Sequence, residues 1–264
     1  YSFTLNGAPA QFAFGQSYVL DGLALFFKRF FLLAAIVVLI LSVDFADRIR
    51  IGIAEFYALV LFALAGMMFA ASANDFTLLF VSLELITVTF YVLVSFLRRR
   101  VESLEAGVKY LILGALSSGF LVYGIALLFG ASGTTNFNEL ADKLANNPAL
   151  GHKSLLTAGV LLVLVGLGFK MAAVPFQIWA PDVYQGSPTP TTAFLSVGSK
   201  AAGVVLLMRL LGTAIPDLAF NLEKLLMAMA AQSIAPEQLV QAGLALPRQT
   251  GGGFYDRFRG RLLF

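Results

Sequence analysis

The sequence has no cysteine and a single histidine, His152, among its 264 residues. The lack of cysteine excludes disulfides, thiolate zinc sites and cysteine-ligated iron–sulfur clusters, and one histidine argues against haem and histidine-rich metal sites. Charge is scarce too, because 12% of the residues are charged, whereas a soluble domain carries about 25%. We therefore expect this chain to bind no cofactor and no metal. The small net charge of +3 does not favour nucleic-acid binding.

Apolar residues are what the chain has in abundance. They make up 59% of the sequence, and the mean hydropathy is +0.84. This leaves too little polar material to cover a soluble globule, so we expect an integral membrane protein whose helices each need about 20 apolar residues to cross the bilayer. The predicted fold is all-α, a polytopic transmembrane bundle of about seven helices. The expected spans are residues 19–43, 53–71, 76–97, 108–128, 155–179, 191–211 and 218–231.

The arginines between spans predict how the bundle is oriented. Short cytoplasmic loops collect Lys and Arg, so the three arginines at 98–100 place that loop inside. Counting back two spans puts Arg48 and Arg50 on the same side. The polar segment 130–154 is then expected to be an outside loop, and the Pro- and Gly-rich segment 180–190 an inside connection.

Three ionisable residues, Glu84, Lys170 and Lys200, each lie near the middle of an expected span. A charge at the bilayer centre costs roughly 2.5 to 3.5 kcal/mol, so such residues usually pair, line wet cavities or relay ions. They are our candidate proton relay. Two simpler explanations stay open, namely that the lysines extend to an interface and that Glu84 is only a structural hydrogen-bond partner. Lys28 and Arg29 interrupt the first span, and we interpret them as its edge.

Pro175 follows Lys170 by between one and two helical turns. Proline lacks the backbone N–H and clashes with the preceding turn, so it frees carbonyl groups in the membrane. Transporters commonly expose ion sites at such helix breaks. The sequence therefore predicts a broken helix in which Lys170 carries a proton and Glu84 is its partner.

Several strings resemble subunit N of bacterial respiratory complex I, the proton-translocating NADH:quinone oxidoreductase. They are SLEL at 82–85, EAGVKYLILGALSSGF at 105–120, YGIAL at 123–127, GLGFKMAAVPFQIWAPDVYQGSPTP at 166–190 and FLSVGSKAA at 194–202. The resemblance covers about residues 1–231. It implies an antiporter-like fold, shared with Mrp-type antiporter subunits, in the inner membrane of a bacterium.

By this resemblance, Glu84 corresponds to the family's glutamate on transmembrane helix five, Lys170 to its lysine on the broken helix seven, and Lys200 to its lysine on helix eight. The resemblance implies that protons pass along this buried axis while NADH, FMN, iron–sulfur clusters and quinone react in other subunits. The implied partners are the other membrane subunits of complex I, the lipid bilayer and protons.

Set against the family pattern, we expect about two helices before Tyr1 and most of the second repeat to be absent from this sequence. We expect a polar segment at 1–18, an incomplete antiporter-like domain at 19–231 and a basic soluble tail at 232–264. The stretch YDRFRGRL at 255–262 resembles a linker of bacterial DNA primase, but the primase zinc cysteines and acidic metal ligands are absent. We therefore predict a joined reading frame without primase activity, with a plain basic tail as the alternative.

Three functional hypotheses follow. The first is a proton-translocating subunit that works within complex I. The second is a fragment or fusion product that keeps the fold and transports nothing. The third is an Mrp-type cation/proton antiporter subunit, which is less favoured because the string FQIWAPDVY at 176–184 is more similar to subunit N.

Overall fold

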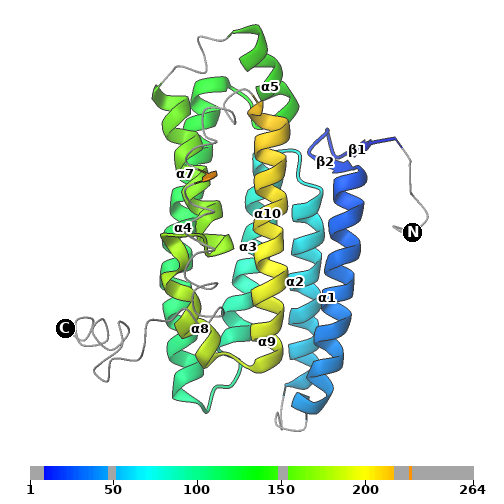
Figure 1. The fold of residues 1–264 in the computed structure, drawn as a ribbon, viewed down its shortest axis with the longest axis vertical. Coiled ribbons are helices and arrows are strands. Elements are labelled where there is room, and N and C mark those ends of the chain that lie inside the picture. Colours follow the sequence, from blue (N-terminus) through cyan, green and yellow to red (C-terminus); the bar gives the residue numbers. More distant parts are fainter. Residues whose placement is uncertain (1–8, 47–51, 148–153, 217–225, 228–264) are drawn as a thin grey trace, which may run out of the picture. The chain divides into compact units, whose positions relative to one another are not determined.

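The computed structural model describes residues 9–46, 52–147, 154–216 and 226–227 (Figure 1). The chain divides into two compact units, residues 1–223 and 224–264. The description below concerns the first unit. The predicted seventh span, apart from residues 226–227, and the predicted tail at 232–264 lie outside the described residues.

In the described residues of this unit, six long helical segments run side by side along one axis (Figure 1). Five are α1 (Gly22–Ala46), α2 (Ile53–Ala71), α3 (Phe76–Val94), α4 (Val101–Ser132) and α7 (Ser154–Met171). The sixth is the segment Thr189–Ala214, whose central part is α10 (Lys200–Arg209). The short elements are β1 (Gln11–Ala13), β2 (Tyr18–Leu20), α5 (Phe137–Asn146), the 3-10 turn η1 (Phe176–Trp179), α8 (Ala180–Gly186), α9 (Thr189–Phe194) and the π-helical turns η2 (Leu195–Ser199) and η3 (Leu210–Ala214).

The described residues contain six stretches that are long and apolar enough to cross a membrane. They are Gly22–Val43, Ile53–Ala71, Phe76–Val94, Val101–Ser132, Ser154–Gly186 and Thr189–Ala214. Large apolar side chains such as Phe26, Leu33 and Ile40 on α1 are mostly exposed, which is unfavourable in water and favourable against lipid. The prediction of an all-α membrane bundle is confirmed.

Several predicted boundaries were wrong. The first helix begins at Gly22, and residues 11–20 form an antiparallel hairpin instead of a polar loop. The helix also continues through Lys28 and Arg29, so these residues do not mark its end. α4 begins seven residues before the predicted span because its first turns are polar yet still helical. The expected outside loop contains the short helix α5, and the expected connection 180–190 is largely helical.

One end of the bundle carries the hairpin and α5, and we call it the hairpin face (Figure 1). Asn74, between α2 and α3, links three segments there. Its backbone N–H donates to the Ser17 carbonyl and its side chain donates to the Gln16 carbonyl, both at 2.9 Å, while its own carbonyl accepts from the Phe137 N–H at 3.1 Å. The hairpin and α5 are therefore fixed to the ends of the spanning helices. The other end, which carries α8, is the opposite face.

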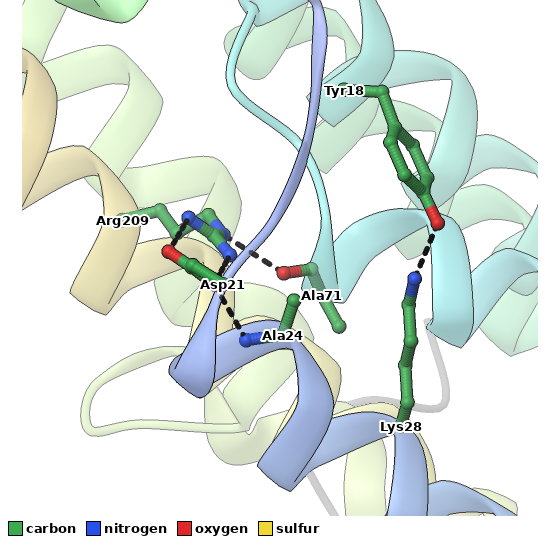
Figure 2. Close-up of polar contacts among 6 residues, drawn as sticks. All are labelled: Tyr18, Asp21, Ala24, Lys28, Ala71 and Arg209. Carbon is green, nitrogen blue, oxygen red and sulfur yellow. Dashed lines mark hydrogen bonds and ion pairs between the residues drawn. The ribbon is translucent and has the colours of Figure 1, made fainter. Parts of the chain in front are cut away.

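A buried arginine ties three helices together at the hairpin face (Figure 2). Arg209 at the end of α10 binds both carboxylate oxygens of Asp21, at 2.7 and 3.2 Å, and its Nε donates to the Ala71 carbonyl at 2.8 Å. Asp21 also caps α1 by accepting from the Ala24 N–H at 2.8 Å. Burial raises the pKa of Asp21, but the Arg209 and Ala24 hydrogen bonds outweigh it and hold that pKa below its ordinary value.

A second polar contact lies beside this one. Lys28 on α1 is buried and donates to the Tyr18 hydroxyl of β2 (Figure 2). Burial raises the pKa of Tyr18, yet hydrogen bonds with Lys28 and Ser72 and the positive charge of Lys28 leave that pKa below its ordinary value. Lys28, a charged residue within the first apolar span, thus has a hydrogen-bond partner on the hairpin.

Candidate functional site

The break predicted near Pro175 is present in the structure. α7 ends at Met171, Ala172 has a left-handed φ of 53°, and Pro175 precedes the 3-10 turn η1. The freed carbonyl groups find other donors: Phe169 O accepts from the Ala172 N–H at 3.0 Å and from the Trp179 indole at 3.0 Å. Buried backbone groups without partners are costly in a membrane, so these bonds make the break tolerable.

Lys170 lies one residue before the end of α7 and is 3% exposed. Its ammonium donates to the Thr87 hydroxyl of α3 at 2.5 Å. The carboxyl end of α7 also carries partial negative charge, which is favourable near a cation. Lys170 therefore points into the bundle, and the alternative that it extends to an interface is wrong for this residue.

Glu84 lies midway along α3, three residues before Thr87, and so faces the same side of that helix. One carboxylate oxygen accepts from the Ser118 hydroxyl of α4 at 2.5 Å. The structure therefore does not pair Glu84 directly with Lys170, because each binds a different hydroxyl group.

Lys200 is half-buried where the π-helical turn η2 gives way to α10. Its ammonium lies 5.6 Å from the centre of the Tyr184 ring on α8, within reach of a cation–π contact. One turn further along α10, a Cβ on Gly203 would lie 2.7 Å from Met171 Cγ and 3.6 Å from Lys170 Cβ. The helix that carries Lys200 thus passes directly beside the end of α7.

An aromatic cluster fills the space around the break. Trp179 stacks on Tyr110 of α4 and on Phe169 of α7, with ring centres 4.9 and 5.5 Å apart, and meets the edge of Tyr184 at 6.1 Å. Tyr110 is 1% exposed and hydrogen-bonds Ser199, the residue before Lys200. The cluster joins the surroundings of Lys170 to those of Lys200 through packed rings.

Comparison with known proteins identifies the family. Residues 73–240, more than half of the chain, match the family described as NADH:quinone oxidoreductase/Mrp antiporter, TM. The chain belongs to this family. The match covers α3 with Glu84, the broken helix with Lys170 and the span with Lys200, and it confirms the resemblance found in the sequence. It also continues past residue 231, the predicted end of the membrane domain, and it gives no support to the primase-like interpretation of the tail, which stays a prediction.

Members of the antiporter family share both sequence and fold with this chain. NADH-quinone oxidoreductase subunit N of Heliobacterium modesticaldum is 46% identical over 203 residues, which cover 77% of this chain and 42% of that protein. A subunit of respiratory complex I from Thermus thermophilus is 39% identical with a TM-score of 0.65, over 79% of this chain and 44% of that one. A subunit of the archaeal membrane-bound sulfane sulfur reductase is 29% identical with a TM-score of 0.69, over 81% and 44%. The chain spans less than half the length of these relatives.

The side chains that hold the candidate residues in place, such as Thr87 and Ser118, were not predicted from the sequence. Thr87 could have been found, because it lies three residues after Glu84 on one helical face. Arg209 could also have been noticed as a further charge within an expected span. Ser118 and Tyr110 gave no such signal, because only the packing of helices brings them to the site. In the described part of the chain, no three His, Asp or Glu side chains come together in a way that could hold a metal.

Proposed function

We propose that this chain is part of a proton-translocating membrane subunit of a complex I type NADH:quinone oxidoreductase in a bacterial inner membrane. Glu84, Lys170 and Lys200 carry the proton through the bundle. The redox cofactors of the complex, NADH, FMN, iron–sulfur clusters and quinone, act in other subunits. Support comes from the family match, from the subunit N relatives and from the location of three ionisable residues within membrane-spanning segments.

The observation that carries this proposal is the burial of Lys170 at the end of a broken membrane helix. A lysine ammonium in such a place has lost its water and depends on a few polar partners. Its neutral and charged forms are then close in energy, so small changes in the Glu84 charge or in local hydration move a proton on or off the amine. Lys200, on the helix that passes beside Met171, is the next site for that proton.

The experiment uses this chain assembled into the complete complex, with both its membrane subunits and the subunits that hold the redox cofactors, and reconstituted in liposomes. NADH oxidation is followed together with acidification of the lumen. Lys170→Ala is expected to lower proton translocation by at least about tenfold, as removal of a proton-transfer group does. Lys143→Ala, the same change at an exposed lysine on α5, serves as the matched control. Unchanged translocation in Lys170→Ala would overturn the relay.

The same preparation tests the two other hypotheses. Translocation that requires sodium ions, and disappears when potassium replaces them, would favour an Mrp-type cation/proton antiporter subunit. An unaltered chain that assembles but supports no translocation at all would identify a fragment that keeps the fold without the function.

A further inference from the structure

Two hydroxyl groups bind two of the candidate relay residues. Thr87 on α3 receives the Lys170 ammonium, and Ser118 on α4 donates to Glu84, both at 2.5 Å. Glu84 and Thr87 lie on one face of the same helix, so the carboxylate and the ammonium approach the same surface of α3. Each therefore has its own hydroxyl partner, and the described residues show no direct ion pair between the two.

The direction of each hydrogen bond is fixed by chemistry. The Thr87 hydroxyl gives its only hydrogen to the Leu83 carbonyl at 2.6 Å, so its oxygen is free to accept from Lys170. An ionised carboxylate can only accept, so Ser118 must donate to Glu84. Thr87 therefore accepts from Lys170, whereas Ser118 donates to the Glu84 carboxylate when that group is ionised.

We propose that Thr87 and Ser118 are positioning residues of the relay: they hold Lys170 and Glu84 in separate hydrogen bonds and so keep Lys170 available to pass its proton on toward Lys200. This inference rests on the proposed function. Without the Thr87 hydroxyl, the Lys170 ammonium can turn toward the Glu84 carboxylate, because Glu84 lies on the same face of α3 as Thr87. A direct ion pair in a water-poor interior then retains the proton, because opposite charges attract strongly there.

Threonine hydroxyls in membrane helices often bond the carbonyl four residues earlier, which alone is a structural role. α3 provides an internal control for that role. Thr89 is also buried and donates to the Leu85 carbonyl at 2.6 Å, and it lies two residues from Thr87 on a different face. A structural role predicts the same result for both threonines, whereas the positioning role predicts an effect only at Thr87.

The test compares Thr87→Val, Thr87→Ser and Thr89→Val in the reconstituted complex. Thr87→Val is expected to lower proton translocation about tenfold, as loss of a hydrogen bond to a charged group does. Thr87→Ser restores the hydroxyl and is expected to return the rate to within about twofold of the original, and Thr89→Val is expected to stay near it. Equal rates in Thr87→Val and Thr89→Val, or no rescue by Thr87→Ser, would overturn the proposal.

Two further variants make the outcome unambiguous. Combining Thr87→Val with Glu84→Gln is expected to cause little loss beyond that of Glu84→Gln alone, because no carboxylate remains to trap the ammonium. If Thr87→Val does not assemble, Ser118→Ala is the test, because an unchanged rate of proton translocation in Ser118→Ala contradicts the positioning role.

The Lys170→Ala variant separates this inference from the proposed function. If Lys170→Ala also translocates protons normally, the proposed function fails. If only Lys170→Ala loses activity, this inference alone fails.

Discussion

Arg209 and Asp21 are 188 positions apart in the sequence and form a two-pronged ion pair at the hairpin face (Figure 2). The arginine is 3% exposed and the aspartate 31%. Because Arg209 ends α10 and Asp21 directly precedes α1, the pair fixes the first and last spanning segments of the described fold against each other. The Arg209 bond to the Ala71 carbonyl adds the end of α2.

Removing the charge of Asp21 is expected to destabilise the bundle. Breaking a fully buried ion pair costs roughly 3 to 5 kcal/mol, and partial exposure reduces this, so we expect Asp21→Asn to lower the free energy of unfolding by about 1 to 3 kcal/mol. The measurement is thermal unfolding in detergent, with Asp142→Asn on exposed α5 as the control. Identical melting temperatures for Asp21→Asn and the original chain would show that the pair contributes nothing.

The same pair predicts a pH dependence with a definite sign. The pKa of Asp21 is lower in the folded chain than its ordinary value of 3.8. A group of this kind stabilises the fold fully above its unfolded pKa and loses that contribution as the pH falls through the folded pKa. The stability difference between the original chain and Asp21→Asn is therefore expected to be constant from about pH 7 to about pH 5 and to close below about pH 3.8. Melting curves over this range check it, and a difference that grows on acidification would be inconsistent with the pair.

The sequence predicted α2 and the helix break well, because both follow from local rules. Residues 56–71 lack charged side chains and are mostly apolar, and proline at 175 interrupts a regular helix. The actual end of α7 lies four residues before Pro175, because Ala172 adopts a left-handed backbone conformation. Alanine rarely adopts that conformation, so the sequence gives no sign of it. The polar first turns of α4 were missed because hydropathy detects lipid contact and not helix formation. The partners Thr87 and Ser118 depend on how helices align, which periodicity on one helix does not specify.

Close packing of α4 on α7 leads to a third prediction. A Cβ on Gly124 would lie 2.8 Å from both the Gly159 carbonyl oxygen and the Val163 nitrogen, so the two backbones approach without side chains between them. Gly124→Ala must push the helices apart and is expected to cost about 1 to 3 kcal/mol of unfolding free energy. Gly119→Ala, on the same helix with open space at its Cβ, is expected to be neutral or slightly stabilising. Thermal unfolding of the two variants side by side is the check, and equal melting temperatures would contradict the close approach.

Trp179 leads to the last prediction, because it is the only tryptophan of the chain and its indole satisfies a carbonyl freed by the break. Trp179→Phe keeps an aromatic ring between Tyr110 and Phe169 but removes the N–H donor. The Phe169 carbonyl keeps its bond from the Ala172 N–H, so loss of the indole bond is expected to cost about 0.5 to 1.5 kcal/mol, and this cost falls on the segment that contains Lys170. Local opening should then become easier, so amide hydrogen exchange across residues 168–176 is expected to quicken while exchange within α2 stays unchanged. Tyr123→Phe removes a donor from an exposed side chain of α4 and is the control. Faster exchange throughout the bundle would indicate general loss of packing, whereas unchanged exchange near the break would mean that the ring alone, without its hydrogen bond, holds the broken helix in place.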